Sequence, residues 1–204
     1  MWLVGCRGLA ALVVLLLAGV MAEPKGVLEH EAVIGVSNGG TWGSWGWQEM
    51  CPEDTYATGF SLKVESYQGE MKDDTALNGI RLFCTRGGHG DKREAHIVES
   101  QSGPWGHWLQ PIWCPEGTYL VRFSLRVEQN RPGIQDVMGA TNVRFACSGG
   151  ATLEGNGLSW GEYGGWSPSC KRVLCGIQTK QEPVRGALRD DTALNDVRFY
   201  CCNH

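Results

Sequence analysis

Apolar and polar residues alternate along several short stretches of this chain with the period of a β-strand. Residues 60–65 read Phe-Ser-Leu-Lys-Val-Glu, and residues 121–128 alternate in the same way. A period of two, with β-branched and aromatic residues on one side, predicts a strand with one buried face. We expect the following side chains to point inward: Phe60, Leu62, Val64, Val121, Phe123, Leu125 and Val127.

These strands belong to a unit that occurs three times. Residues 41–85 and 104–148 align without a gap at a constant offset of 63, and a more divergent third copy covers 159–202. The hexapeptide Asp-Asp-Thr-Ala-Leu-Asn at 73–78 returns letter for letter at 190–195. Each copy closes with a second apolar stretch that ends in cysteine. Such a repeat predicts one closed domain built from three equivalent parts.

The fold class follows from the repeat and the alternation. The chain contains 29 glycines and shows no apolar 3.6-residue pattern after residue 22, so long helices are not expected. Three antiparallel sheets with one apolar face each can bury those faces only against one another. We therefore predict an all-β, three-sided β-prism with pseudo-threefold symmetry and a single core, in one domain over residues 33–204.

The first 22 residues have the features of a secretory signal peptide. Arg7 precedes an apolar run over residues 9–18, and small residues follow at 20–22. The run is shorter than the roughly 20 residues that span a bilayer. We predict a secreted, extracellular chain without a membrane span, in which residues 23–32 form a short lead-in.

The cysteine pattern predicts disulfide bonds. Without Cys6 of the leader, eight of the nine cysteines remain, which is an even number in a chain expected to be secreted. The repeat pairs Cys51 with Cys84 and Cys114 with Cys147. For the third copy it favours Cys170–Cys201 with Cys175–Cys202, and the swapped pairing of Cys170–Cys202 with Cys175–Cys201 stays open. The third copy has lost two inward hydrophobic residues over 176–181, and we hypothesise that its extra disulfide compensates.

Charge and motifs exclude several function classes. The net charge is −4, and without Arg7 it is −5, because the chain then has 17 basic and 22 acidic residues. An acidic chain of this kind is not expected to bind nucleic acid. The cysteines lack metal-type spacing, and the five histidines do not recur between copies. No phosphate-binding glycine loop or nucleophile elbow occurs. We expect no metal, no cofactor and no catalytic motif.

Several motifs together resemble the vitelline membrane outer layer protein I family. They are Trp-Gly-Ser-Trp at 42–45 with its echoes, Cys-Pro-Glu-Asp-Thr-Tyr at 51–56, the hexapeptide at 73–78 and the cysteine pair at 201–202. The resemblance covers residues 33–204. It implies a β-prism of three Greek-key sheets, secretion, a role in or near an extracellular matrix, and handling of chitin-like oligosaccharides of N-acetylglucosamine.

Tryptophan is the first candidate for binding chemistry. The eight tryptophans beyond the leader gather at the start of each copy, and flat indole rings suit the faces of sugar rings. We expect Trp42, Trp105 and Trp160 to form a threefold layer in the core. The less regular positions are the candidates for carbohydrate binding: Trp47, Trp113 and Trp166.

Recurring charged residues form the second candidate set. Asp73, Asp136 and Asp190 precede the last strand of each copy, so a closed prism would bring them to one end as sugar ligands or as acid and base. The other interpretation, which we favour, is a turn role, and a similar role suits Asn78 and Asn195. We expect the recurring glutamates at 65, 128 and 182 to pair across strands with the arginines at 81, 144 and 198.

Three classes of function remain, and one of them is a protein–protein adaptor in the matrix, because exposed tryptophan also marks protein interfaces. We favour a secreted, disulfide-stabilised structural or binding protein of an extracellular coat or fluid, which acts as a monomer and has extracellular glycans or matrix proteins as partners. The alternative is an enzyme, a weak glycosyl transferase or hydrolase acting on chitin-like oligosaccharides through the aspartates.

Overall fold

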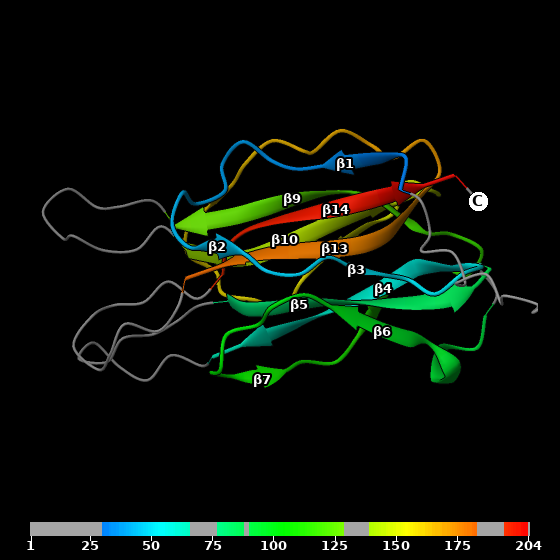
Figure 1. Ribbon diagram of the computed structural model, residues 1–204, viewed down its shortest axis with the longest axis horizontal. Helices are drawn as coiled ribbons and strands as arrows, with labels where there is room; N and C mark the ends of the chain where they lie inside the picture. Colours follow the sequence, from blue (N-terminus) through cyan, green and yellow to red (C-terminus); the bar gives the residue numbers. More distant parts are fainter. Residues whose placement is uncertain (1–29, 66–76, 88–89, 129–138, 183–193, 204) are drawn as a thin grey trace, which may run out of the picture.

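The computed structural model describes residues 30–65, 77–87, 90–128, 139–182 and 194–203 (Figure 1). Regular structure in these ranges is almost entirely β-strand, and the one helical turn there is a 3-10 helix, η1 (Lys92–Glu94). The all-β prediction is therefore confirmed. The expected signal peptide at 1–22 lies outside the described residues.

Each repeat contributes one hairpin of two long antiparallel strands. The hairpins are β4 (Thr55–Val64) with β5 (Leu77–Arg86), β9 (Leu120–Glu128) with β10 (Gly139–Cys147), and β13 (Val173–Gln181) with β14 (Leu194–Cys202). Strands β4, β9 and β13 run toward the same end of the molecule, at the left of Figure 1. We call this end, where these three strands stop, the hairpin end.

Short strands extend each hairpin into a sheet. One edge carries β6 (His96–Glu99) on β5, β11 (Thr152–Glu154) on β10, and β1 (Ala32–Ile34) on β14. The other edge carries β7 (His107–Trp108) and β8 (Ile112–Trp113) on β4, β12 (Glu162–Tyr163) on β9, and β2 (Ser44–Trp45) and β3 (Glu49–Met50) on β13. We call these the opening strands, because they come from the Trp-Gly segment that opens each repeat.

The opening strands do not join their own repeat. Those of the second repeat pair with β4 of the first, those of the third pair with β9 of the second, and those of the first pair with β13 of the third. In the first two sheets three consecutive strands are followed by a fourth that returns beside the first, which is the Greek-key order. The third sheet has the same spatial order, with β1 from the start of the chain in the place next to β14. The Greek-key prediction is confirmed, and the exchange links the three sheets into a ring.

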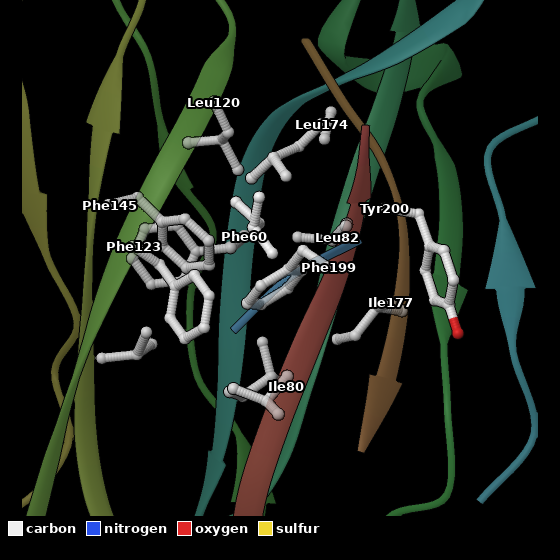
Figure 2. Close-up of a cluster of buried hydrophobic side chains, with 14 of the residues drawn as sticks. Phe60, Ile80, Leu82, Leu120, Phe123, Phe145, Leu174, Ile177, Phe199 and Tyr200 are labelled. Atoms are coloured by element: carbon white, nitrogen blue, oxygen red, sulfur yellow. The ribbon is translucent and has the colours of Figure 1, made fainter. Parts of the chain in front are cut away.

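The inner faces of the sheets meet in one aromatic core. Figure 2 shows the rings of Phe60, Phe123, Phe145 and Phe199 gathered between the strands, with aliphatic side chains above and below. Phe145 lies 4.6 Å from Phe60 and 5.2 Å from Phe199 between ring centroids, so residues from all three repeats touch. These phenylalanines are fully buried. At about 25 cal/mol per Å² of apolar surface, such rings provide a large share of the stabilisation of the fold.

One predicted inward position is wrong. Val121 is only half-buried, and its neighbour Leu120 fills the core instead. The cause is a β-bulge: Arg122 pairs with Ala146 and Leu120 pairs with Cys147, so Val121 is the extra residue. A bulge reverses the inside–outside alternation, and the sequence does not mark its position. The other six predicted inward residues are buried.

The third sheet carries polar residues where the others carry aliphatic ones. Thr179 and Gln181 occupy the places of Leu62 and Val64, and both are buried. Thr179 Oγ1 donates to the carbonyl of Gln101 at 2.5 Å, and Gln181 Nε2 donates to the same carbonyl at 3.1 Å. The donor groups of both side chains are thus paired with the segment that follows β6.

The described part of the chain contains four disulfide bonds. In the first two repeats Cys51–Cys84 and Cys114–Cys147 join the segment before one long strand to the end of its partner, as predicted. The third repeat contains Cys170–Cys201 and Cys175–Cys202, so the favoured of the two open pairings is confirmed.

Candidate functional site

The Trp-Gly pair of each repeat sits on the end of a long strand of the preceding sheet. Gly43, Gly106 and Gly161 all have a positive φ, of 82°, 76° and 82°. A Cβ atom on Gly106 would lie 2.3 Å from the carbonyl oxygen of Val64, and one on Gly161 would lie 2.5 Å from that of Val127. Glycine is needed here for the left-handed turn and for the close approach of two backbones. The tryptophan before each glycine is therefore held at the hairpin end.

These three tryptophans are exposed, so the predicted core layer is wrong. Their exposed fractions are 56 % for Trp42, 51 % for Trp105 and 38 % for Trp160. The phenylalanines already fill the centre of the prism (Figure 2), and each Trp-Gly segment leads into a strand at the edge of a sheet. Exposed indole rings recur in all three repeats at one end, which makes them a candidate site for a ligand with apolar faces. We call them the end tryptophans.

The glycine after each end tryptophan lies close in space to the backbone of a glutamate of the preceding sheet. The Cβ of Gly106 would also lie 2.6 Å from the backbone nitrogen of Glu65, and Gly43 and Gly161 have the same relation to Glu182 and Glu128. An end tryptophan therefore recurs three times next to the backbone of a glutamate at the end of a long strand.

The predicted Glu–Arg pairing does not match the register. Arg81 lies opposite Ser61, and Arg144 lies opposite Ser124. Each of these serines comes four residues before the recurring glutamate. Each arginine instead stacks on an aromatic ring of an opening strand. The guanidinium carbon lies 4.4 Å from the ring centroid in three equivalent pairs: Arg198 with Trp45, Arg81 with Trp108, and Arg144 with Tyr163. Contacts of this kind stabilise a structure by roughly 0.5–2 kcal/mol each.

The polar residues opposite those arginines anchor the same segments. Ser61 Oγ donates to the carbonyl of Leu109 at 2.6 Å, and Ser124 Oγ donates to that of Gly164 at 2.8 Å. Gln178 Nε2 donates equivalently to Gly46 at 2.6 Å. The recurring arginines and hydroxyl or amide groups thus attach the exchanged strands to their host sheets.

Two of the three predicted carbohydrate-binding tryptophans have occupied ring faces. Trp113 is half-buried, between Phe83 at 5.1 Å and the Lys92 ammonium at 5.4 Å. Trp166 is half-buried against the guanidinium groups of Arg144 at 4.7 Å and Arg122 at 4.9 Å. Both rings belong to the outer faces of the sheets, where they pack with cations.

Trp47, the third predicted residue, is exposed. Its side chain is 56 % exposed, as much as that of Trp42, but it lies along the side of the prism. Its Nε1 donates to the carbonyl of Glu99 on β6 at 3.1 Å, so the indole spans from the third sheet to the first. Trp47 and the end tryptophans therefore occupy different parts of the surface.

Asp73, Asp136 and Asp190 lie outside the described residues, and their place at the hairpin end stays a prediction. Asn78 and Asn195 were expected in turns but are fully buried in β5 and β14, each at the second position of its strand.

Two titratable groups near the exchanged segments have shifted pKa values. Burial and the neighbouring carboxylate of Glu154 raise the pKa of Tyr163, whose hydroxyl donates to Glu154 Oε1 at 3.1 Å. Burial also raises the pKa of Asp196, against the hydrogen bond that its Oδ1 accepts from the Val197 nitrogen at 2.8 Å. Within the described ranges no three metal-ligating side chains gather into a cation site. The described part also contains no helix long and apolar enough to cross a membrane.

Residues 32–204 match the family described as Vitelline membrane outer layer protein I. The chain belongs to this family. The vitelline membrane outer layer protein 1 homolog of Mus musculus is 54 % identical over 195 residues, covering 92 % of this chain and 94 % of the mouse protein. The Homo sapiens homolog is 55 % identical over 181 residues, covering 89 % of this chain and 88 % of its own. Family membership and four disulfides are consistent with an extracellular location.

Solved structures share the fold of this family member at low sequence identity. The crystal structure of an artocarpin–mannotriose complex covers 84 % of this chain and 97 % of its own, with a TM-score of 0.52 and 12 % identity. Calystegia sepium agglutinin covers 85 % and 97 %, with a TM-score of 0.54 and 9 % identity. A mannose-binding jacalin-related lectin from Ananas comosus reaches 0.52 at 13 % identity. Together with the Greek-key order, these matches confirm the β-prism.

Proposed function

We propose that this protein is a secreted structural component of an extracellular coat or fluid, and that it binds oligosaccharides through the end tryptophans. The observation that carries the proposal is the exposure of Trp42, Trp105 and Trp160, which are equivalent residues at one end of the prism. Exposed aromatic rings cost solvation free energy and are kept where a ligand or partner covers them. Threefold repetition offers several weak stacking sites to one chain-like ligand.

The expected ligand is an oligosaccharide of N-acetylglucosamine. Its pyranose rings have apolar faces that stack on indole, and its hydroxyl and amide groups form hydrogen bonds at their rims. The predicted aspartates Asp73, Asp136 and Asp190 would add acceptors at the same end. Proteins with this fold include the mannose-binding lectin and the artocarpin–mannotriose complex, which supports sugar binding by analogy of fold alone.

The test is a binding titration with chitohexaose, preceded by a glycan array. Saturable binding of the wild-type chain is expected, and the triple variant Trp42→Ala/Trp105→Ala/Trp160→Ala should weaken it at least about tenfold, which is about 1.4 kcal/mol. Calorimetry is the readout, because the substitutions remove fluorophores. Trp47→Ala is the matched control, since Trp47 is as exposed as Trp42 but lies on the side of the prism.

Two results would overturn the proposal. One is a wild-type chain that binds no glycan, and the other is a triple variant that binds as tightly as the wild type. The same incubation examines the alternative enzyme function: new oligosaccharide chain lengths that disappear in Asp73→Asn/Asp136→Asn/Asp190→Asn would assign glycosyl transfer to the aspartates.

A further inference from the structure

Two of the opening segments have an identical aromatic spacing. Trp42 and Trp45 are separated by two residues, and so are Trp105 and Trp108. No other pair of tryptophans in the chain has this spacing, and in the third repeat Tyr163 stands three residues after Trp160. Trp-x-x-Trp is the acceptor sequence for C-mannosyl transfer in the secretory pathway, where the first tryptophan receives the sugar. As with any short motif, its structural context decides its value.

The structure gives the two tryptophans of each motif different environments. Trp42 and Trp105 are both more than half exposed, while Trp45 and Trp108 stack under Arg198 and Arg81. The positive φ of the intervening glycine turns the chain between them. A sugar is a bulky polar group that a folded protein accommodates only at its surface. The first tryptophan of each motif meets this requirement.

We infer that Trp42 and Trp105 are sites of C-mannosylation, a covalent modification that falls on two of the three end tryptophans to which the proposed function assigns glycan binding. In the transfer, Cδ1 of the indole attacks the anomeric carbon of a lipid-linked mannosyl phosphate donor. A carbon–carbon bond forms, the bond between the anomeric carbon and the phosphate oxygen breaks, and the polyprenyl phosphate leaves with the electron pair. Cδ1 then loses its proton to a base of the transferase, which restores the aromatic ring.

The third repeat is an internal control. Trp160 follows the same Gly161 turn, with φ of 82°, and it too is exposed. Its repeat differs at the motif position, where Tyr163 stacks under Arg144 in place of a tryptophan. The inference therefore predicts sugar on Trp42 and Trp105 and none on Trp160, although all three occupy equivalent places.

The experiment is peptide mass spectrometry of the full chain, expressed with its leader in a mammalian cell line. The expected result is one added hexose on the peptides that contain Trp42 and Trp105, with the cross-ring fragmentation of a carbon-linked sugar, and an unmodified Trp160 peptide. Protein refolded from a bacterial host, which lacks the transferase, should carry no hexose. Unmodified Trp42 and Trp105 in the mammalian protein would overturn the inference.

Variants test the motif within one molecule. Trp45→Ala should remove the hexose from Trp42 and leave the hexose on Trp105. The hexose that remains on Trp105 is a control, because it shows that the variant has met the transferase in the secretory pathway. Tyr163→Trp should add a hexose to Trp160, because it completes the third motif at a place where an aromatic ring already fits. Hexose that stays on Trp42 in the Trp45→Ala variant would overturn the assignment to the Trp-x-x-Trp motif.

Discussion

Replacement of Gly106 by alanine tests the idea that the exchange of strands depends on a glycine turn. In this variant the new Cβ would lie 2.3 Å from the Val64 carbonyl oxygen and 2.4 Å from its carbonyl carbon. These are backbone atoms at the end of β4, and they cannot rotate away as the tip of a flexible side chain can. Residue 106 also has a φ of 76°, a conformation that alanine adopts at a cost.

The two contributions have separable magnitudes. The left-handed conformation costs an alanine about 1–2 kcal/mol. The contact with the strand end adds about 1–3 kcal/mol, the range for overpacking a well-packed region. The free energy of unfolding should therefore fall by about 2–5 kcal/mol, with a melting temperature lower by roughly 5–15 °C for a chain of this size.

Two other glycines provide matched controls. Gly150 has a φ of 89° but no atom within 4 Å of a new Cβ, so Gly150→Ala should cost only the conformational part. Gly35 has no neighbour within 4 Å and no positive φ, so Gly35→Ala should change the free energy of unfolding by less than about 0.5 kcal/mol. Denaturant unfolding under oxidising conditions measures all three. A Gly106→Ala variant no less stable than Gly150→Ala would refute the role of the close backbone approach.

Two further predictions concern the third repeat. Asp196 lies opposite Lys180, and in the second repeat Asn142 takes the equivalent place opposite Arg126. Burial raises the pKa of Asp196 in the folded chain, so the charged form of this side chain destabilises the fold. Replacement by the neutral amide in Asp196→Asn should therefore raise the melting temperature at pH 7. This advantage should shrink as the pH falls through the folded-state pKa of Asp196 and vanish below about 3.9, its unfolded value; an advantage that grows toward acid pH would contradict the assignment. The double variant Cys175→Ala/Cys202→Ala opens a bridge with a sequence separation of 27 and should lower the free energy of unfolding by about 3 kcal/mol in denaturant titrations. An unchanged midpoint would end the hypothesis that this bridge compensates for the polar inward residues of β13.

Much of the fold could be predicted because alternation and repetition are local signals. The alternating residues 60–65 lie in a strand with Phe60, Leu62 and Val64 buried, and equal cysteine spacing gave the pairing in the first two repeats. The error at Val121 arose from a bulge, whose extra residue leaves no mark on the alternation. The candidate site was predicted less well, because exposure of a tryptophan depends on what the rest of the chain places over it.

The partners of the recurring arginines also could not be predicted from local patterns. Their recurrence at 81, 144 and 198 indicated a shared structural role, and the opposite charge of the recurring glutamates made an ion pair the simplest partner. The actual partners are aromatic rings brought in from the next repeat, such as Trp108 over Arg81. The sequence did contain a sign of these contacts, because an aromatic residue recurs at a fixed distance after each Trp-Gly pair. Without knowledge of the strand exchange, however, this residue could not be assigned to the arginine of the preceding repeat.

Alternation and repetition were enough to predict the all-β class, the three repeats, most of the inward residues and the disulfide pairs of the first two repeats. The tertiary structure was needed to show that each repeat gives its opening strands to a neighbouring repeat, and that Trp42, Trp105 and Trp160 are exposed at the hairpin end. The physical reason is that a strand's pattern fixes which of its faces is buried, while the sheet that it joins is chosen by backbone hydrogen bonds, which are the same for every residue.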